Sequence, residues 1–211
     1  MKRVSIMLAA LLVLALAVAA QAQVKPVVYA GGGISMPMAP EFFSDYWGTG
    51  YNVGGGLGIQ INPSIEVTGS LFFNAFPLDD EKLIEDAGDA GKGITVDGLD
   101  FQSLEFGIDL KYILRASQAE AKLLPYLTVG VGMSNVKFTD VTFTGGDESL
   151  TLPVGSYSET DFALNGGAGV NYMFSPKFGA WVEGRYTVVM TEGDSIQYIP
   201  VRAGVKLLFG E

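Results

Sequence analysis

Nine charged side chains lie within five segments whose alternate residues are apolar, and they are the residues of this chain best suited to charge chemistry. The nine are Glu66, Glu105, Asp109, Lys111, Asp161, Glu183, Arg185, Arg202 and Lys206. Carboxylates and cations that share an enclosed face can neutralise one another, because a buried charge without a partner costs several kcal/mol. The pattern predicts a network of ion pairs, with Glu183 facing Arg202 across the last hairpin.

Catalytic chemistry has little support from the residue types. The chain contains no histidine and no cysteine, so the commonest general base, the commonest metal ligand and every thiolate are missing. Serine and glutamate are present, but no nucleophile–base pair is recognisable. We therefore expect no catalytic residue, no cofactor and no metal site. Gly54-Gly55-Gly56 does not indicate a nucleotide loop, because no helix follows it.

A second group of charges lies between residues 77 and 99. Its seven acidic members are Asp79, Asp80, Glu81, Glu85, Asp86, Asp89 and Asp97. Their spacing does not fit the calcium loop of an EF-hand. A solvated, flexible loop is the favoured interpretation, and a site for calcium or lipopolysaccharide-linked cations is the alternative.

The elements that carry the nine charges follow a period of two, which is typical of β-strands. Seven strands are predicted over 51–61, 65–76, 103–112, 126–135, 161–174, 178–190 and 198–209. In each strand one face is apolar and the other is small or polar, and all nine charges fall on the polar face. An eighth strand near 27–35 would place Val28, Ala30 and Ile34 on its apolar face.

The connections between these strands alternate in length. Those at 36–49, 77–99 and 137–160 are long, whereas Asn62-Pro63-Ser64 and Ser175-Pro176-Lys177 are tight turns. Long and short connections alternate in this way in an up-and-down outer-membrane barrel, whose short turns are periplasmic. The strand lengths match the roughly 9–11 residues of a tilted membrane strand. The sequence therefore predicts an all-β fold, an eight-stranded antiparallel up-and-down transmembrane β-barrel.

Aromatic residues support a membrane boundary. Six of them are predicted to form a girdle at the strand ends beside the short turns: Tyr112, Tyr126, Tyr172, Phe174, Phe178 and Phe209. Four more occupy the first long connection, namely Phe42, Phe43, Tyr46 and Trp47. These four either form an adhesive tip or fold back on the barrel rim, and the second arrangement is favoured.

The first 22 residues have the pattern of a secretory signal peptide. A basic start at Lys2-Arg3 precedes an apolar run, and Ala20-Gln21-Ala22 supplies a cleavage motif. The barrel domain is then expected over residues 23–211. Without Lys2 and Arg3 this remainder has 11 basic and 23 acidic residues, a net charge of −12, which argues against nucleic acid as a partner.

The chain also resembles a known family. The resemblance rests on Val28-Tyr29-Ala30-Gly31-Gly32-Gly33, on the glycine-rich alternating strands, and on the ending Ile199-Pro200-Val201-Arg202-Ala203-Gly204-Val205-Lys206-Leu207-Leu208-Phe209. These segments resemble the OmpA/OmpX/OmpW-like outer membrane β-barrel domain, often labelled the porin family. The resemblance implies a Gram-negative outer-membrane protein whose partners are outer membrane lipid, lipopolysaccharide and the outer-membrane assembly machinery. The chain departs from the family pattern in one respect, because Gly210 and Glu211 follow the terminal aromatic residue.

Three functional hypotheses follow. The first is a monomeric outer-membrane barrel with a structural, adhesive or passive small-solute role, its lumen plugged by ion pairs. An interlocked interior is expected because Gly54 and Gly56 would lie opposite Phe72, and Gly169 and Gly167 opposite Glu183 and Arg185. The second is a soluble periplasmic barrel that turns its apolar face inward around an apolar ligand. The third is a barrel enzyme acting on lipid, which the missing histidine disfavours.

Overall fold

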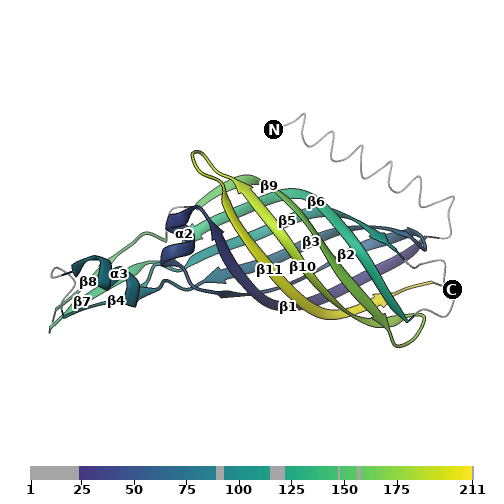
Figure 1. Cartoon of the computed structure of the whole chain (residues 1–211), viewed down its shortest axis with the longest axis horizontal. Helices are drawn as coiled ribbons and strands as arrows, with labels where there is room; N and C mark the ends of the chain where they lie inside the picture. The colour runs from purple at the N-terminus through teal and green to yellow at the C-terminus, as the bar shows by residue number, and fades with distance from the viewer. Residues whose placement is uncertain (1–23, 89–92, 115–121, 147, 156–157, 211) are drawn as a thin grey trace.

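The main body of the computed structural model is a closed barrel of antiparallel strands (Figure 1). The structure describes residues 24–88, 93–114, 122–146, 148–155 and 158–210, so the predicted signal peptide lies outside the described residues. The barrel strands are β1 (Lys25–Ala39), β2 (Gly50–Asn62), β3 (Ile65–Phe76), β5 (Phe101–Ile113), β6 (Leu123–Phe138), β9 (Ser158–Met173), β10 (Phe178–Met190) and β11 (Ile196–Leu208). Their order is β1-β11-β10-β9-β6-β5-β3-β2. The predicted eight-stranded up-and-down barrel is confirmed.

The apolar faces of the strands point outward and the polar faces point into the barrel. Leu57 and Val129 are 67% and 59% exposed, whereas Glu66 and Asp109 are fully buried. In β1, Ile34 is also exposed, as its predicted register requires. A soluble barrel would bury its leucines and expose its charges, so the apolar outer wall is the surface that lipid covers. Within the described residues, no helix is long and apolar enough to cross a membrane.

Glycines inside the strands make room for large lumen side chains. Gly54 is the register partner of Phe72, and a Cβ atom on Gly54 would lie 2.6 Å from the Phe72 ring. Gly169 is the register partner of Glu183, and a Cβ atom on Gly169 would lie 2.5 Å from the Tyr126 ring. Both predicted pairings are confirmed. At these positions the narrow barrel holds a bulky residue because the facing residue has no side chain.

The two ends of the barrel differ strongly. At one end β2 and β3 are joined by a tight turn in which the Asn62 side chain accepts hydrogen bonds from the backbone of Ser64 and Ile65, at 2.8 and 2.9 Å, an arrangement common in asparagine turns. At the other end the chain forms five further elements: α2 (Glu41–Tyr46), α3 (Asp80–Asp86), β4 (Ile94–Gly98), β7 (Val141–Gly145) and β8 (Glu148–Leu152). Short turns are periplasmic in outer-membrane barrels, so we expect these elements to be external.

The external elements include a sheet that projects beyond the barrel (Figure 1). Its three strands lie in the order β4-β7-β8. The expected flexible acidic loop is therefore wrong for most of 77–99, which contains α3 and β4. The helix α3 is capped by the Asp79 side chain, which accepts from the backbone of Lys82 at 3.1 Å. A cap of this kind stabilises a helix start by about 1 kcal/mol.

Side-chain contacts join α2 to α3. Tyr46 donates a hydrogen bond to Asp86 at 2.8 Å, and this acceptor raises the pKa of the Tyr46 hydroxyl. Lys82 forms an ion pair with Asp45 at 3.4 Å, with both side chains close to half exposed. Because exposed pairs contribute roughly 0–1 kcal/mol, these contacts orient the two helices and add little stability.

Candidate functional site

The candidate site is the barrel lumen, where most of the predicted charges converge. Eight of the nine face one another there, four acidic and four basic: Glu66, Glu105, Asp109, Glu183, Lys111, Arg185, Arg202 and Lys206. Each of the eight takes part in an ion pair. Their formal charges sum to zero, so this network of eight residues carries no net charge.

The central ion pairs run across the barrel from β10. Arg185 contacts Asp109 of β5 at 2.6 Å and also pairs with its neighbour Glu183. Glu183 pairs with Lys111 at 3.4 Å and accepts a hydrogen bond from the Tyr126 hydroxyl at 3.0 Å. All of these side chains are almost completely buried. A carboxylate held between two cations and a hydroxyl keeps its charge in a place that water does not reach.

Lys111 is surrounded by aromatic rings as well as by its carboxylate. Its Nζ atom lies 4.7 Å from the ring centre of Tyr29, 5.0 Å from that of Tyr126 and 5.9 Å from that of Trp181. Aromatic faces attract a cation, by up to about 2 kcal/mol when water is excluded. Nearby, Lys206 of β11 pairs with Glu66 of β3 across the lumen. Side chains therefore pack closely in this half of the interior.

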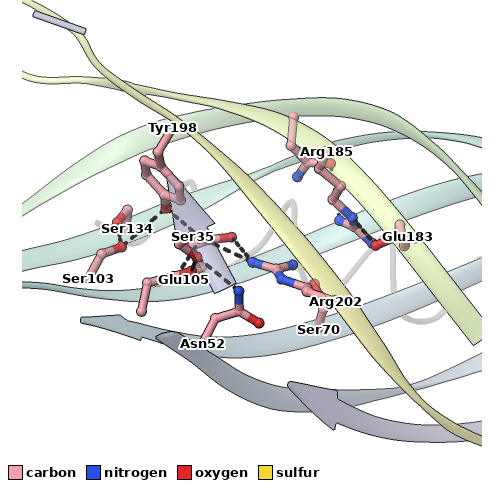
Figure 2. Close-up of polar contacts among 12 residues, drawn as sticks. Ser35, Asn52, Ser70, Ser103, Glu105, Ser134, Glu183, Arg185, Tyr198 and Arg202 are labelled. Atoms are coloured by element: carbon pink, nitrogen blue, oxygen red, sulfur yellow. Dashed lines mark hydrogen bonds and ion pairs between the residues drawn. The ribbon is translucent and has the colours of Figure 1, made fainter. Parts of the chain in front are cut away.

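A second group of polar contacts lies closer to the external mouth (Figure 2). Arg202 approaches the Glu105 carboxylate at 3.3 and 3.4 Å, and its guanidinium lies 3.8 Å from the ring centre of Phe72. The same carboxylate accepts hydrogen bonds from Tyr198 and from Asn74, the latter at 2.7 Å. Glu105 thus joins three strands, namely β5, β3 and β11.

Neutral side chains extend this group around the wall. Ser35 donates to Asn74 at 2.9 Å, and Asn52 donates to Ser35 at 2.9 Å. Ser103, the register partner of Asn74 on the neighbouring strand, contacts Ser134 at 2.7 Å. These residues come from five different strands, so the hydrogen bonds connect the wall through its interior.

Aromatic residues close the lumen at the external mouth. Phe43 and Trp47 of the first connection are each 4% exposed and belong to one cluster with Phe76, Phe101 and Tyr198. The Phe43 and Phe101 ring centres are 4.9 Å apart, and the Trp47 indole donates to the backbone of Leu99 at 2.9 Å. The predicted fold-back on the rim therefore describes Phe43 and Trp47, while Phe42 stays 61% exposed.

The structure differs from the sequence predictions at four residues. Glu183 and Arg202 are register partners on β10 and β11, but their ion pairs run to other residues. Asp161 lies apart from the network, with one buried oxygen that has no partner among the described residues. Tyr126, predicted in the outer girdle, is 1% exposed and points into the lumen. The alternation had already placed it there, since Leu127 faces outward.

Several lumen residues were not singled out from the sequence. Tyr29, Trp181 and Tyr198 are each buried beside the charges. The alternation in the sequence could have identified them, because each stands at a polar-face position of its strand. Large aromatic residues at such positions fill a small lumen and leave little room for water.

One small cavity lies between these side chains. A cavity of about 10 Å³ is lined in part by Ser70, Glu105, Asn165 and Thr187, which is room for about one water molecule. Among the described residues, no cluster of three or more potential metal ligands occurs. The arrangement pairs buried charges with one another.

Comparison with known proteins agrees with this architecture. Residues 8–209 match the family described as outer membrane protein beta-barrel domain. A major outer membrane protein from Thermus thermophilus has a similar structure, with a TM-score of 0.52, 13% identity, and coverage of 88% of this chain and 99% of that one. Neisserial surface protein A gives a TM-score of 0.51 at 14% identity, covering 88% and 96%. At these identities the likeness concerns the fold alone. The curated proteins contain no match.

Proposed function

Since the chain belongs to the outer membrane protein beta-barrel domain family, we propose that it is a closed, non-conducting barrel that anchors an external projection in the outer membrane. The projection consists of α3, β4, β7 and β8. On this proposal the barrel has a structural role, and contacts with other molecules are made outside the membrane. This is the structural and adhesive alternative of the sequence hypotheses, and a solute conduit is not favoured.

The observation that supports closure is the buried, neutral network of four carboxylates and four cations. A water-filled conduit would leave these side chains hydrated and separated, whereas Asp109, Glu183, Arg185 and Arg202 are at most 3% exposed. Opening a path between them would break several charge-assisted contacts at once, each worth roughly 1.5–3 kcal/mol. Thermal fluctuations would seldom open such a lumen.

The aromatic cluster at the mouth gives the barrel a second seal. Phe43 and Trp47 stand between the external solution and the Glu105 group, and Tyr198 belongs to both the cluster and that group. Solutes would have to displace both layers. The proposal includes no reaction, since the chain lacks histidine and cysteine and no nucleophile–base pair is recognisable.

The outer wall fits a monomer surrounded by lipid. Leu57, Val129 and Phe106 are all more than half exposed, and Tyr172, Phe174 and Phe178 form a contiguous aromatic group near one short turn. We propose outer membrane lipid and lipopolysaccharide as the partners of this wall. The outer-membrane assembly machinery would insert it.

Recordings from planar bilayers test closure. Purified wild-type protein should give no stepwise conductance, and a variant that combines Glu183→Ala with Arg202→Ala should leak, because it interrupts both polar groups. Asp45→Ala removes an exposed charge and serves as the control that stays closed. Folded protein would be selected by its heat-dependent gel mobility. A steady, reproducible conductance from the wild type would contradict the proposal.

A further inference from the structure

The projecting sheet ends in a strand that has only one neighbour. In the order β4-β7-β8, the strand β8 pairs with β7 on one side and with no other described strand on its other side. All five of its residues, 148–152, are exposed. Unpaired edges of this kind are templates for pairing with another chain.

The register shows which backbone groups are available at this edge. Gly145 pairs with Glu148 across a two-residue connection, and Gly146 has a φ of 62°, as in the turns that close tight hairpins. In such a ladder alternate residues direct both backbone groups to their partner. Glu148, Leu150 and Leu152 therefore bond to β7, while the N–H and C=O groups of Ser149 and Thr151 point to the open side.

The edge lacks three of the devices that commonly block strand pairing. Residues 148–152 contain no proline, no lysine and no bulge, although proteins commonly protect exposed edges in these ways. Leu150 and Leu152 are 61% and 43% exposed. They lie on the same face as Phe143 and Val141, their register partners in β7. An added strand would extend this apolar face.

The net charge of the external segments indicates which kind of chain could add such a strand. The external segments 77–100 and 139–157 contain 11 acidic residues against Lys82 and Lys92, a net charge of −9. A second copy of the chain would bring an equal charge to the same place and be repelled, whereas a basic chain would be attracted.

We propose that the open edge of β8 binds an extended, basic segment of a partner protein by strand addition. Backbone hydrogen bonds to Ser149 and Thr151 would fix the segment, as in other cases of peptide binding at sheet edges. Alternate apolar side chains of the segment would lie beside Leu150 and Leu152. Its lysines or arginines would lie on the opposite face, which also carries Asp97. This inference rests on the proposed function, since only an external projection meets partner proteins.

Peptide binding to the purified protein in lipid nanodiscs tests the proposal. The probe is a fluorescent seven-residue peptide that alternates lysine and valine, and anisotropy measures its binding. It should bind wild-type protein and Thr151→Val, which keeps the backbone N–H. Thr151→Pro removes that donor and should weaken binding about tenfold.

Two further peptides make the test independent of how the variants fold. The same peptide N-methylated at alternate residues cannot form a full ladder and should bind about tenfold more weakly. A glutamate–valine peptide should not bind. Equal affinity for the methylated peptide would show that charge alone drives binding and would overturn the proposal. Dimerisation of the protein without peptide would also overturn it, because the edge would then pair with a second copy. Conductance is measured separately, so failure of this proposal and failure of barrel closure are distinguishable.

Discussion

Replacing Glu183 by glutamine should destabilise the folded barrel strongly, although it changes the side-chain volume very little. Among the described residues, Glu183 is the ion-pair partner of Lys111, and the two charged groups lie 3.4 Å apart. Its loss leaves a buried cation without a carboxylate, which costs about 3–5 kcal/mol in proteins. Arg185 keeps its 2.6 Å contact with Asp109, and the rings around Lys111 offset part of the loss. We therefore expect the free energy of unfolding to fall by about 3 kcal/mol.

The assay is reversible urea unfolding of the protein in lipid vesicles, followed by tryptophan fluorescence. The chain has two tryptophans, and both Trp47 and Trp181 are buried when it is folded. Asp45→Asn is the matched control, because it removes the carboxylate of an exposed pair and should cost less than about 1 kcal/mol.

A second substitution separates charge from packing. Adding Lys111→Met to Glu183→Gln removes the isolated cation, so the double variant should regain most of the lost stability. The reasoning is refuted if Glu183→Gln costs no more than the Asp45 control, or if the losses in the double variant simply add.

Three more predictions concern the free energy of unfolding of variants in the wall and the mouth. Gly169→Ala should lower it by about 1–3 kcal/mol because its Cβ would meet the Tyr126 ring. Gly184→Ala is the control and should change unfolding in urea very little, because nothing lies within 4 Å of its Cβ. Leu57→Arg should lower the free energy of unfolding in vesicles by up to about 2–4 kcal/mol, depending on the depth of residue 57 in the bilayer, because it places a charge in lipid. An unchanged urea midpoint would argue against a lipid-facing wall. Phe43→Ala removes a buried ring from the mouth and should cost about 3–5 kcal/mol, measured by the same unfolding curves, and a loss below about 1 kcal/mol would mean that the ring does not seal the mouth.

The barrel wall could be predicted because a period of two assigns every residue of a strand to one of two faces. The tight turns at Asn62 and Ser175 then set the register of the neighbouring strands. For this reason the pairings of Gly54 with Phe72 and of Gly169 with Glu183 follow from counting residues away from the turns.

The choice of ion-pair partners could not be predicted in the same way. Counting residues from a hairpin identifies only neighbours on adjacent strands. It placed Glu183 opposite Arg202 correctly, but the two side chains form ion pairs with other residues. In a narrow barrel long side chains also reach across the lumen, as Arg185 of β10 does to Asp109 of β5. Those contacts depend on the tilt and closure of the barrel, which the local pattern does not contain.

The projecting sheet was missed for a related reason. The strands β4 and β8 have five residues each, and their flanks are rich in glycine and acidic residues, which also suit a solvated loop. β4 is stabilised by pairing with β7, a segment far along the chain. Short strands whose partners are distant give a weak local signal.

Reaction of single introduced cysteines with a water-soluble maleimide tests the central claim most directly, since the chain has no cysteine of its own. Thr128 points into the lumen and Val129 points outward, 2% and 59% exposed, while Ser149 lies on the projection. In outer-membrane vesicles Ser149→Cys should react, and neither Thr128→Cys nor Val129→Cys should react, because one is sealed in the lumen and the other is covered by lipid. Labelling of Thr128→Cys would show an open lumen, and labelling of Val129→Cys would show that the apolar wall is not in the membrane.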